Sequence, residues 1–279
     1  MATTGQNHFL LRTNDVAVVR SEAQAKTLAP AAPATSGPHP WQVKPWARLV
    51  RRCLRHKEYS RWVQAYCRPL QVTGQARLSL LHGPAIFIAN HQSHMDTPVI
   101  MAALPDAMRD DFYFGAAADR WFVKGKKKLI LQPWYQSLVM GNFPIVRGGG
   151  SKTLDYARKL LDDGHNICIF PEGTRAMSDQ LGEFRHGVAL LAKAAGVPVV
   201  PIVLQGLREL RPKGAPAVTP GPVSATILEP IYLPADMPVA AATALLRNTM
   251  NQVFGKPLQQ PLPAGSASSS VPDPQTEAA

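Results

Sequence analysis

The feature that most constrains the fold is a series of short apolar segments that begins after Gly83, each separated from the next by segments typical of helices or loops. Six segments have the length and apolar content of buried strands: residues 85–89, 112–118, 143–146, 167–170, 199–204 and 225–233. Helices are predicted at residues 98–104, 151–163, 188–195 and 238–254, with Gly164, Gly196 and Gly255 just beyond three of them. Strands alternating with helices predict an α/β fold, with a largely parallel or mixed central sheet flanked by helices.

The two ends of the chain differ in composition from this central part. Residues 1–40 finish with "APAAPATSGPHP", and residues 257–279 are similarly rich in Pro, Ala and Ser. Such segments cannot bury enough apolar surface to offset the entropy cost of ordering, so we expect both to be disordered. The folded part is then a basic helical segment at 41–80 followed by a domain at 81–256.

The start of that basic segment has the charge pattern of a surface helix. Residues 41–61 contain seven Lys or Arg and one acid, Glu58, a net of 7 − 1 = +6. From about Trp46 we predict a basic amphipathic helix, whose apolar side includes Leu49, Cys53 and Leu54. Such a helix can lie at an anionic lipid surface. Equally, its apolar stripe can pack on the core while its charges stay solvated.

Composition narrows the class of partner. The formal net charge of +11 favours an anionic partner: nucleic acid, a membrane surface or a phosphorylated substrate. A non-catalytic basic protein that binds nucleic acid or membranes is therefore a second hypothesis, but no nucleic-acid-binding module is present, and we predict no nucleic-acid partner. Three cysteines without a C-x-x-C pair argue against a disulfide framework or a zinc site. We find neither a signal peptide nor an apolar run long enough to span a bilayer, so we expect a peripheral protein on the cytoplasmic side of a membrane.

The stretch "ANHQSHMD", residues 89–96, follows directly on a predicted strand. A loop that curls from the strand into the next helix would bring His91 to Asp96, which could accept a hydrogen bond from one ring nitrogen and leave the other free as a base. Thr97 would then cap the helix. The alternative is a purely structural hydrogen-bonding feature at a strand–helix junction. Of the neighbours, His94 is a rival base, and Ser93 is more typical of a hydrogen-bonding loop residue than of a nucleophile.

Two later stretches bring guanidinium groups to strand ends. "IFPEGTR", 169–175, contains Arg175, and "GNFPIVRGGG", 141–150, contains Arg147. An arginine can grip phosphate or carboxylate through paired hydrogen bonds, and Gly173 permits close backbone approach. A surface turn with a Glu172–Arg175 ion pair is the alternative for the first stretch. The three consecutive glycines lack the spacing of a nucleotide-binding loop.

Taken in order, "NHQSHMD", "GNFPIVR", "FPEGTR" and "VPVVPI" resemble the motifs of the glycerolipid acyltransferase family, typified by 1-acylglycerol-3-phosphate acyltransferase, over about residues 80–210. The resemblance implies transfer of a fatty acyl group from acyl-CoA or acyl carrier protein to the sn-2 hydroxyl of 1-acylglycerol-3-phosphate, or to another lysolipid or polar-lipid hydroxyl. Many membrane-bound members begin with apolar spanning helices, whereas this chain is basic before its first motif, which favours attachment at the interface.

The resemblance also assigns residues. His91 would be the general base and Asp96 would orient it. The residues that would bind the acceptor are Asn90, Phe143, Arg147, Glu172, Gly173, Thr174 and Arg175. No metal and no cofactor is implied beyond the acyl thioester as co-substrate. The expected partners are a lysophospholipid, the thioester, an anionic membrane surface and, for one type of donor, acyl carrier protein.

Overall fold

The computed structural model describes residues 35–149, 151–175, 180–210 and 217–255. The predictions of disorder for residues 1–34 and 257–279 lie outside the described residues. Residues 35–40, which the first of these predictions also includes, contact the folded part: the Ser36 N–H donates to the Phe122 carbonyl, and Thr35 forms a β-bridge with Val123.

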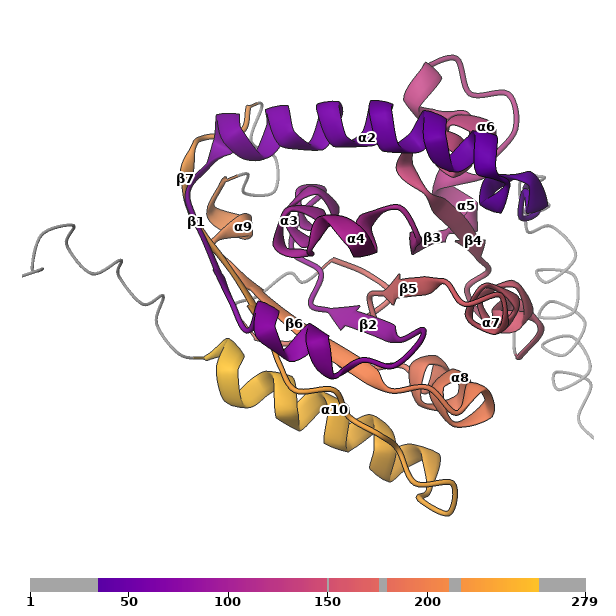
Figure 1. The fold of residues 1–279 in the computed structure, drawn as a ribbon, viewed down its shortest axis with the longest axis vertical. Helices are drawn as coiled ribbons and strands as arrows, with labels where there is room; N and C mark the ends of the chain where they lie inside the picture. The colour runs from indigo at the N-terminus through magenta and orange to yellow at the C-terminus, as the bar shows by residue number, and fades with distance from the viewer. Residues whose placement is uncertain (1–34, 150, 176–179, 211–216, 256–279) are drawn as a thin grey trace, which may run out of the picture. The chain divides into compact units, whose positions relative to one another are not determined.

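A seven-stranded sheet forms the centre of the described chain (Figure 1). Its strands are β1 (Cys67–Thr73), β2 (Ile86–Ala89), β3 (Phe112–Ala117), β4 (Asn142–Ile145), β5 (Asn166–Ile169), β6 (Val199–Gln205) and β7 (Gly221–Ile227). The spatial order is β1-β7-β6-β2-β5-β3-β4. All neighbours run parallel except β6 and β7, so the five strands from β6 to β4 end at one common edge.

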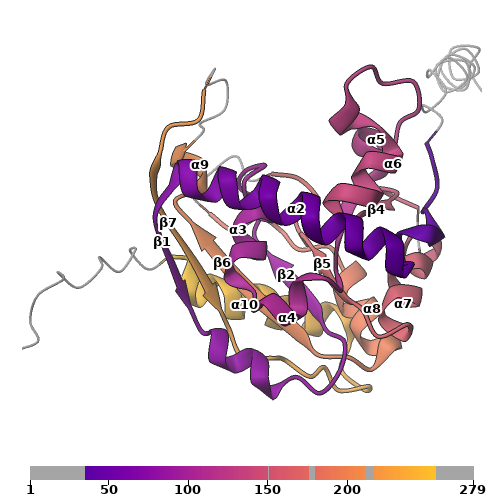
Figure 2. The same ribbon diagram turned by 45° about the horizontal axis from the view of Figure 1, so that its top comes forward.

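Helices cover both faces of the sheet (Figures 1 and 2). The main ones are α2 (Pro45–Tyr66), α3 (Asp96–Ala103), α7 (Asp155–Asp162), α8 (Gly187–Ala195) and α10 (Val239–Phe254). The shorter ones are η1 (Pro40–Val43), η2 (Gln75–Leu80), α4 (Asp106–Arg109), α5 (Ala118–Trp121), η3 (Leu129–Leu131), α6 (Pro133–Tyr135), η4 (Gln136–Met140), η5 (Ser151–Leu154) and α9 (Leu207–Leu210).

The alternation of side chains along β2 explains this two-sided covering. Phe87 and Ala89 belong to a core cluster shared with α2 and α3, whereas Ile86 and Ile88 belong to a second cluster shared with α7, α8 and α10. All four residues are fully buried. A strand buried on both faces is the pattern of a parallel sheet between two helical layers. The predicted fold class, a mixed sheet flanked by helices, is therefore confirmed.

The boundaries differ from the predictions in places. Strand β1 lies within the segment 41–80, predicted as helical, where Pro69 and the polar residues around it hide the strand pattern. The last strand ends at Ile227 rather than at residue 233, and beyond it only Ile231 bridges to Val199. Helix α3 starts at Asp96, so Thr97 lies in its first turn and is not its cap.

Helix α2 packs with an unexpected face inward. Its buried residues are Ala47, Arg51, Arg55, Tyr59 and Val63, one every fourth position. The apolar residues predicted to form one side, facing either a lipid surface or the core, include Trp46, Leu49 and Leu54, which are 54%, 65% and 48% exposed. Cys53 is exposed as well. Within the described chain, no helix combines the length and the apolar content required to cross a membrane.

Candidate active site

The loop that joins β2 to α3 folds His91 back onto Asp96. His91 Nδ1 lies 2.6 Å from Asp96 Oδ2, and the Asp96 side chain is completely buried. The same carboxylate accepts the backbone N–H groups of Gln92, at 2.8 Å, and of Ser93, at 2.9 Å. The loop therefore closes around one carboxylate, which is the geometry expected from the spacing of the two residues in the sequence.

Asp96 also determines which ring nitrogen of His91 carries a proton. Burial raises the pKa of Asp96, and the hydrogen bonds from His91, Ser93 and Gln92 act in the opposite direction because they stabilise the carboxylate. With Nδ1–H donating to this carboxylate, Nε2 is the unprotonated ring nitrogen and can accept a proton. The ring stacks on Phe170, at 4.3 Å between centroids, so its orientation is fixed from two directions.

Glu172 holds the backbone on the other side of His91. Its carboxylate accepts the His91 N–H at 2.9 Å and the Gly182 N–H at 3.1 Å. Burial raises the pKa of Glu172, an effect that these two hydrogen bonds oppose. The residue is 8% exposed and forms no part of the cavity wall described below. Glu172 thus supports the histidine loop from behind, and its contact with the acceptor stays a prediction.

Two further residues predicted to contact the acceptor lie in the interior. The Asn90 amide donates to the Leu204 carbonyl at 2.9 Å and accepts the Leu204 N–H at 2.8 Å, which ties the end of β2 to β6. Phe143 is fully buried in the core between the sheet and α7. Neither residue lines the cavity, and their contact with the acceptor stays a prediction.

A cavity of about 1130 Å³ opens at the carboxyl ends of the parallel strands. Of the predicted site residues, His91, Arg147, Gly173, Thr174 and Arg175 line it. Open α/β sheets bind ligands at this edge. Other parts of the wall are apolar and come from elsewhere in the chain: Trp62 of α2, Phe114 of β3, and Ile130, Leu131 and Met140 from the region of η3 and η4.

Gly173 lines the cavity, as predicted for close approach to a ligand, and it also shapes the turn. Its backbone φ is +69°, and a Cβ atom there would lie 2.7 Å from Arg185 Nε. The positive φ favours glycine, so the residue permits the turn that presents Thr174 and Arg175 to the cavity.

Three arginines that the sequence analysis did not single out also line the cavity: Arg120, Arg185 and Arg208. Arg120 Nη2 lies 3.2 Å from His94 Nε2, and its guanidinium lies over the Trp121 ring at 5.4 Å. Burial lowers the pKa of Arg120, and so do the nearby charges of Arg175 and Arg147. His94 thus supports a cation beside the predicted anion site, a role that only the folded chain reveals. Arg147 also contacts Asp119, at 3.6 Å.

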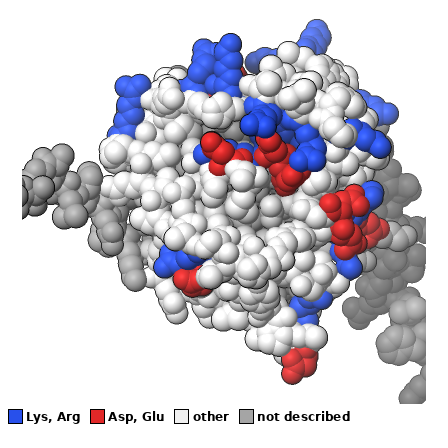
Figure 3. Space-filling model, in the orientation of Figure 1, with Lys and Arg blue, Asp and Glu red and all other residues white. Residues whose placement is uncertain are grey.

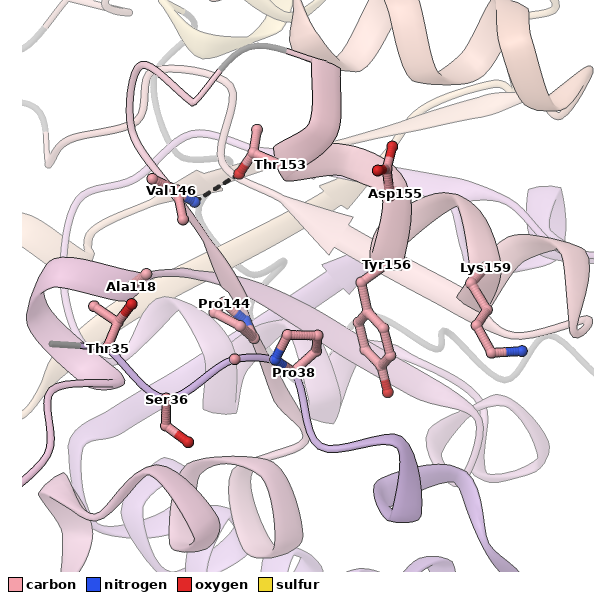
Figure 4. A pocket seen from close by; sticks show the side chains of 11 residues that line it. Thr35, Ser36, Pro38, Ala118, Pro144, Val146, Thr153, Asp155, Tyr156 and Lys159 are labelled. Carbon is pink, nitrogen blue, oxygen red and sulfur yellow. Dashed lines mark hydrogen bonds between the residues drawn. The ribbon is translucent and has the colours of Figure 1, made fainter.

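A second, smaller cavity of about 380 Å³ borders the first (Figure 4). The two share Val146 and Thr153 in their walls, and the Val146 N–H donates to Thr153 Oγ1 at 2.6 Å between them. Tyr156 and Lys159 of α7 line it opposite residues 35–38. It contains none of the predicted site residues. In the described part of the chain, no group of three His, Cys, Asp or Glu side chains is arranged to hold a metal ion.

Comparison with known proteins agrees with this site. The acyltransferase family model matches residues 69–205, which include His91, Asp96, Arg147 and the stretch 169–175. A relative named 1-acyl-sn-glycerol-3-phosphate acyltransferase BAT2, chloroplastic, from Brassica napus is 28% identical over 187 residues, covering 65% of this chain and 51% of the relative. The alpha 1-acyl-sn-glycerol-3-phosphate acyltransferase of Mus musculus is 27% identical, over 61% of this chain and 59% of its own length.

A solved structure has the same fold. The crystal structure of the 1-acyl-sn-glycerophosphate acyltransferase PlsC from Thermotoga maritima matches with a TM-score of 0.58 at 20% identity, covering 85% of this chain and 87% of that one. The chain spans about half the length of the Brassica napus relative. The family match includes the histidine loop, the arginine-bearing strand ends and five of the seven strands in full. Over residues 69–205 the chain is therefore similar to the acyltransferase family.

Proposed function

We propose that this protein transfers a fatty acyl group from an acyl thioester, on CoA or acyl carrier protein, to the sn-2 hydroxyl of 1-acylglycerol-3-phosphate, giving phosphatidic acid. The observation that carries the proposal is the His91–Asp96 pair, 2.6 Å apart, in the wall of a large cavity that Arg147 and Arg175 also line. The names of the relatives in Brassica napus and Mus musculus support the same acceptor.

In this proposal His91 removes the proton of the acceptor hydroxyl. Nε2 accepts the proton as the oxygen attacks the thioester carbonyl, and Asp96 stabilises the imidazolium that forms. The tetrahedral intermediate collapses with loss of the thiolate, which takes up the proton from His91. A thiol pKa near 8.5 makes this a good leaving group, so no covalent acyl-enzyme is needed.

The arginines supply the charge for the acceptor's phosphate. Arg147 and Arg175 line the same cavity as His91, and Arg120 lies close enough to both for its pKa to be lowered by their charges. Paired guanidinium hydrogen bonds suit a phosphate monoester. The apolar wall from Trp62 to Met140 offers surface for a fatty chain.

We also propose that the protein works at a membrane surface, on its cytoplasmic side. The exposed face of α2 combines Trp46, Leu49 and Leu54 with exposed Arg52, Lys57 and Arg61. Indole and leucine side chains among basic residues suit an anionic lipid interface. The three free cysteines fit a reducing compartment.

The test is mass spectrometry of lipids formed from acyl-CoA or acyl carrier protein and a panel of lysolipids. We expect phosphatidic acid as the main product and a loss on the order of 10²–10⁴-fold in kcat for His91→Ala, because the base is gone. His94→Ala is the matched control for removing an imidazole and should retain far more turnover. Full activity of His91→Ala would refute its role, and the absence of any acylated product would refute the function.

A second part of this experiment tests whether the acceptor carries a phosphate. Arg175→Ala should lower kcat/KM for 1-acylglycerol-3-phosphate by about 10–100-fold, since a charge-assisted contact is lost. It should change kcat/KM for a monoacylglycerol, which has no phosphate, by much less. An equal loss on both acceptors would argue for a different acceptor headgroup.

A further inference from the structure

The segment that follows α5 and runs into the start of α6, residues 123–134, is here named the lysine loop. It contains Lys124, Lys126, Lys127 and Lys128 and no acidic residue. Among the described residues, no carboxylate lies within ion-pair distance of these four lysines. Large apolar side chains follow them and are turned outward: Leu129 is 57% exposed, Ile130 43% and Trp134 45%. The loop therefore presents positive charge and apolar surface side by side.

Polar side chains hold the lysine loop in this conformation. The Gln132 amide donates to the Lys126 carbonyl, and the Gln136 amide donates to the Ile130 carbonyl. Gln136 is itself held by the Asn142 amide, which donates to its Oε1 at 2.6 Å. The Gln132 contact is exposed, whereas Gln136 is buried and fixes the loop from its inner side. The loop is thus held in a conformation in which its large apolar groups face outward.

The position of the loop relates it to the active-site cavity. Ile130 and Leu131 form part of the cavity wall, as does Trp62 of α2. Both ribbon views show the loop projecting away from the sheet beyond α2 (Figures 1 and 2). In the space-filling view, blue Lys and Arg side chains are most numerous along the upper margin, where Figure 1 places α2 and the loop (Figure 3). The loop and α2 thus lie at two sides of one cavity.

We propose that the lysine loop is a second contact with an anionic phospholipid bilayer, in addition to α2. The lysines meet the headgroups, while Leu129, Ile130 and Trp134 enter the interface. A lipid acceptor would then reach the cavity directly from the bilayer, between the loop and α2. This inference rests on the proposed function to the extent that the acceptor is a membrane lipid.

Charge alone would also suit the phosphates of CoA or an acidic carrier protein. The exposed apolar residues decide between these partners, because a soluble phosphate has no use for them. Leu129 and Trp134 do not line the cavity, so a cofactor bound there would not cover them either. A bilayer accommodates both features at once.

Vesicle binding tests the inference directly. Full-length protein is sedimented with vesicles of phosphatidylcholine alone, or of phosphatidylcholine with phosphatidylglycerol. Leu129→Ser/Trp134→Ser removes the apolar tip, and Lys124→Gln/Lys127→Gln removes two charges. The matched apolar control is Tyr232→Ser/Leu245→Ser, at side chains 63% and 39% exposed elsewhere. The matched charge control is Arg158→Gln/Lys159→Gln on α7. Thermal unfolding checks that each variant is folded.

We expect the wild type to bind the anionic vesicles, and each loop variant to bind them about tenfold or more weakly, with both controls unchanged. Three outcomes would overturn the inference: no binding by the wild type, loop variants that bind like the wild type, or loss on lysine replacement alone. The last outcome would show a purely electrostatic contact, in which Leu129 and Trp134 do not enter the bilayer.

Turnover on a short-chain acceptor dissolved as monomers separates this inference from the proposed function. The loop variants should keep their kcat on that acceptor, because neither variant removes a residue of the cavity. A wild type that binds vesicles through the loop but acylates no acceptor would refute the function and leave the lipid contact standing. Loss of turnover on the dissolved acceptor in the loop variants would count against a purely membrane role.

Discussion

Charged side chains are buried in two regions of this protein, with opposite signs and opposite partners. At the carboxyl edge of the sheet, Asp96 and Glu172 accept hydrogen bonds from backbone N–H groups of the loops. Under α2, Arg51 and Arg55 donate to backbone carbonyls: Arg51 to Gln42, Ser137 and Leu138, and Arg55 to Phe112 and Arg109. Each region uses buried charge to satisfy main-chain groups that no helix or strand supplies with a partner.

The two regions differ in whether a group that can accept a proton is left at the cavity wall once these hydrogen bonds are made. The carboxylate of Asp96 takes one nitrogen of His91 and leaves the other at the cavity wall. Arg51 is fully buried, and burial lowers the pKa of Arg55 only to about 10, so Arg55 stays cationic and acts as neither acid nor base at neutral pH. A buried carboxylate beside a histidine is suited to acid–base catalysis. The buried arginines are suited to holding α2 against the rest of the domain.

The largest effect expected from this comparison follows the replacement Asp96→Asn. The asparagine oxygen, in the place of Oδ1, can still accept the Ser93 N–H. Its NH₂ group, in the place of Oδ2, faces His91 Nδ1 and favours the tautomer with the proton on Nε2, and the Gln92 N–H loses its acceptor. The base is then blocked, and kcat should fall on the order of 10²–10⁴-fold with the fold retained. Steady-state kinetics measures kcat, and circular dichroism checks that the variant keeps its fold. Asp106→Asn, at a carboxylate 90% exposed, is the control. A kcat within about threefold of wild type would place Asp96 outside the mechanism.

The replacement Arg51→Met tests the other region and should act on stability. Methionine matches the length of the side chain but leaves the carbonyls of Gln42, Ser137 and Leu138 without their donor. We expect a loss of about 2–4 kcal/mol in the free energy of unfolding, measured in urea. Its neighbour offers the control: Arg52 is 70% exposed and pairs with Asp110, so Arg52→Met should cost less than about 0.5 kcal/mol. Equal losses would mean that burial of Arg51 is not what fastens α2.

Part of the site could be predicted from the sequence because its residues lie close together along the chain. His91 and Asp96 are five residues apart, and a strand followed by a helix constrains the loop between them to curl. The arginines at strand ends were accessible for a similar reason, since parallel strands bring their carboxyl ends together. The supporting roles of Asn90 and Glu172 depend on Leu204 and Gly182, which are distant in sequence, so the sequence offered no sign of them.

Helix α2 shows where pattern reasoning fails. The sequence left two partners open for the apolar side, a lipid surface or the core, and placed the basic residues in solvent. Tertiary acceptors instead bury Arg51 and Arg55. Carbonyls from η4, α4 and the start of β3 lie beneath the helix and outweigh the cost of burying guanidinium groups. The residues thereby left outside, Trp46 and Leu49, then need another partner. Which face of α2 is buried is thus decided by orphan carbonyls far along the chain.

The smallest expected effect concerns the ion pair at the edge of this region. Asp111 Oδ2 lies 2.6 Å from Arg48 of α2, and its Oδ1 lies 3.2 Å from His165 Nδ1. The hydrogen bond with His165 and the charge of Arg48 hold the pKa of Asp111 below its usual value, against the effect of burial. A depressed carboxyl pKa contributes stability above the ordinary pKa, and this contribution is lost as the pH falls through the folded-state value.

Asp111→Asn should therefore cost about 0.5–1 kcal/mol at neutral pH, an amount kept small because the side chain is 33% exposed. Below about pH 3 the wild type should lose the same contribution, so that the two proteins converge. Urea unfolding across a pH series measures the difference. Asp106→Asn should follow the wild type within a few tenths of a kcal/mol throughout. A difference that stays constant with pH would show that Asp111 acts through packing, and that the charged fastening of α2 resides in the buried arginines alone.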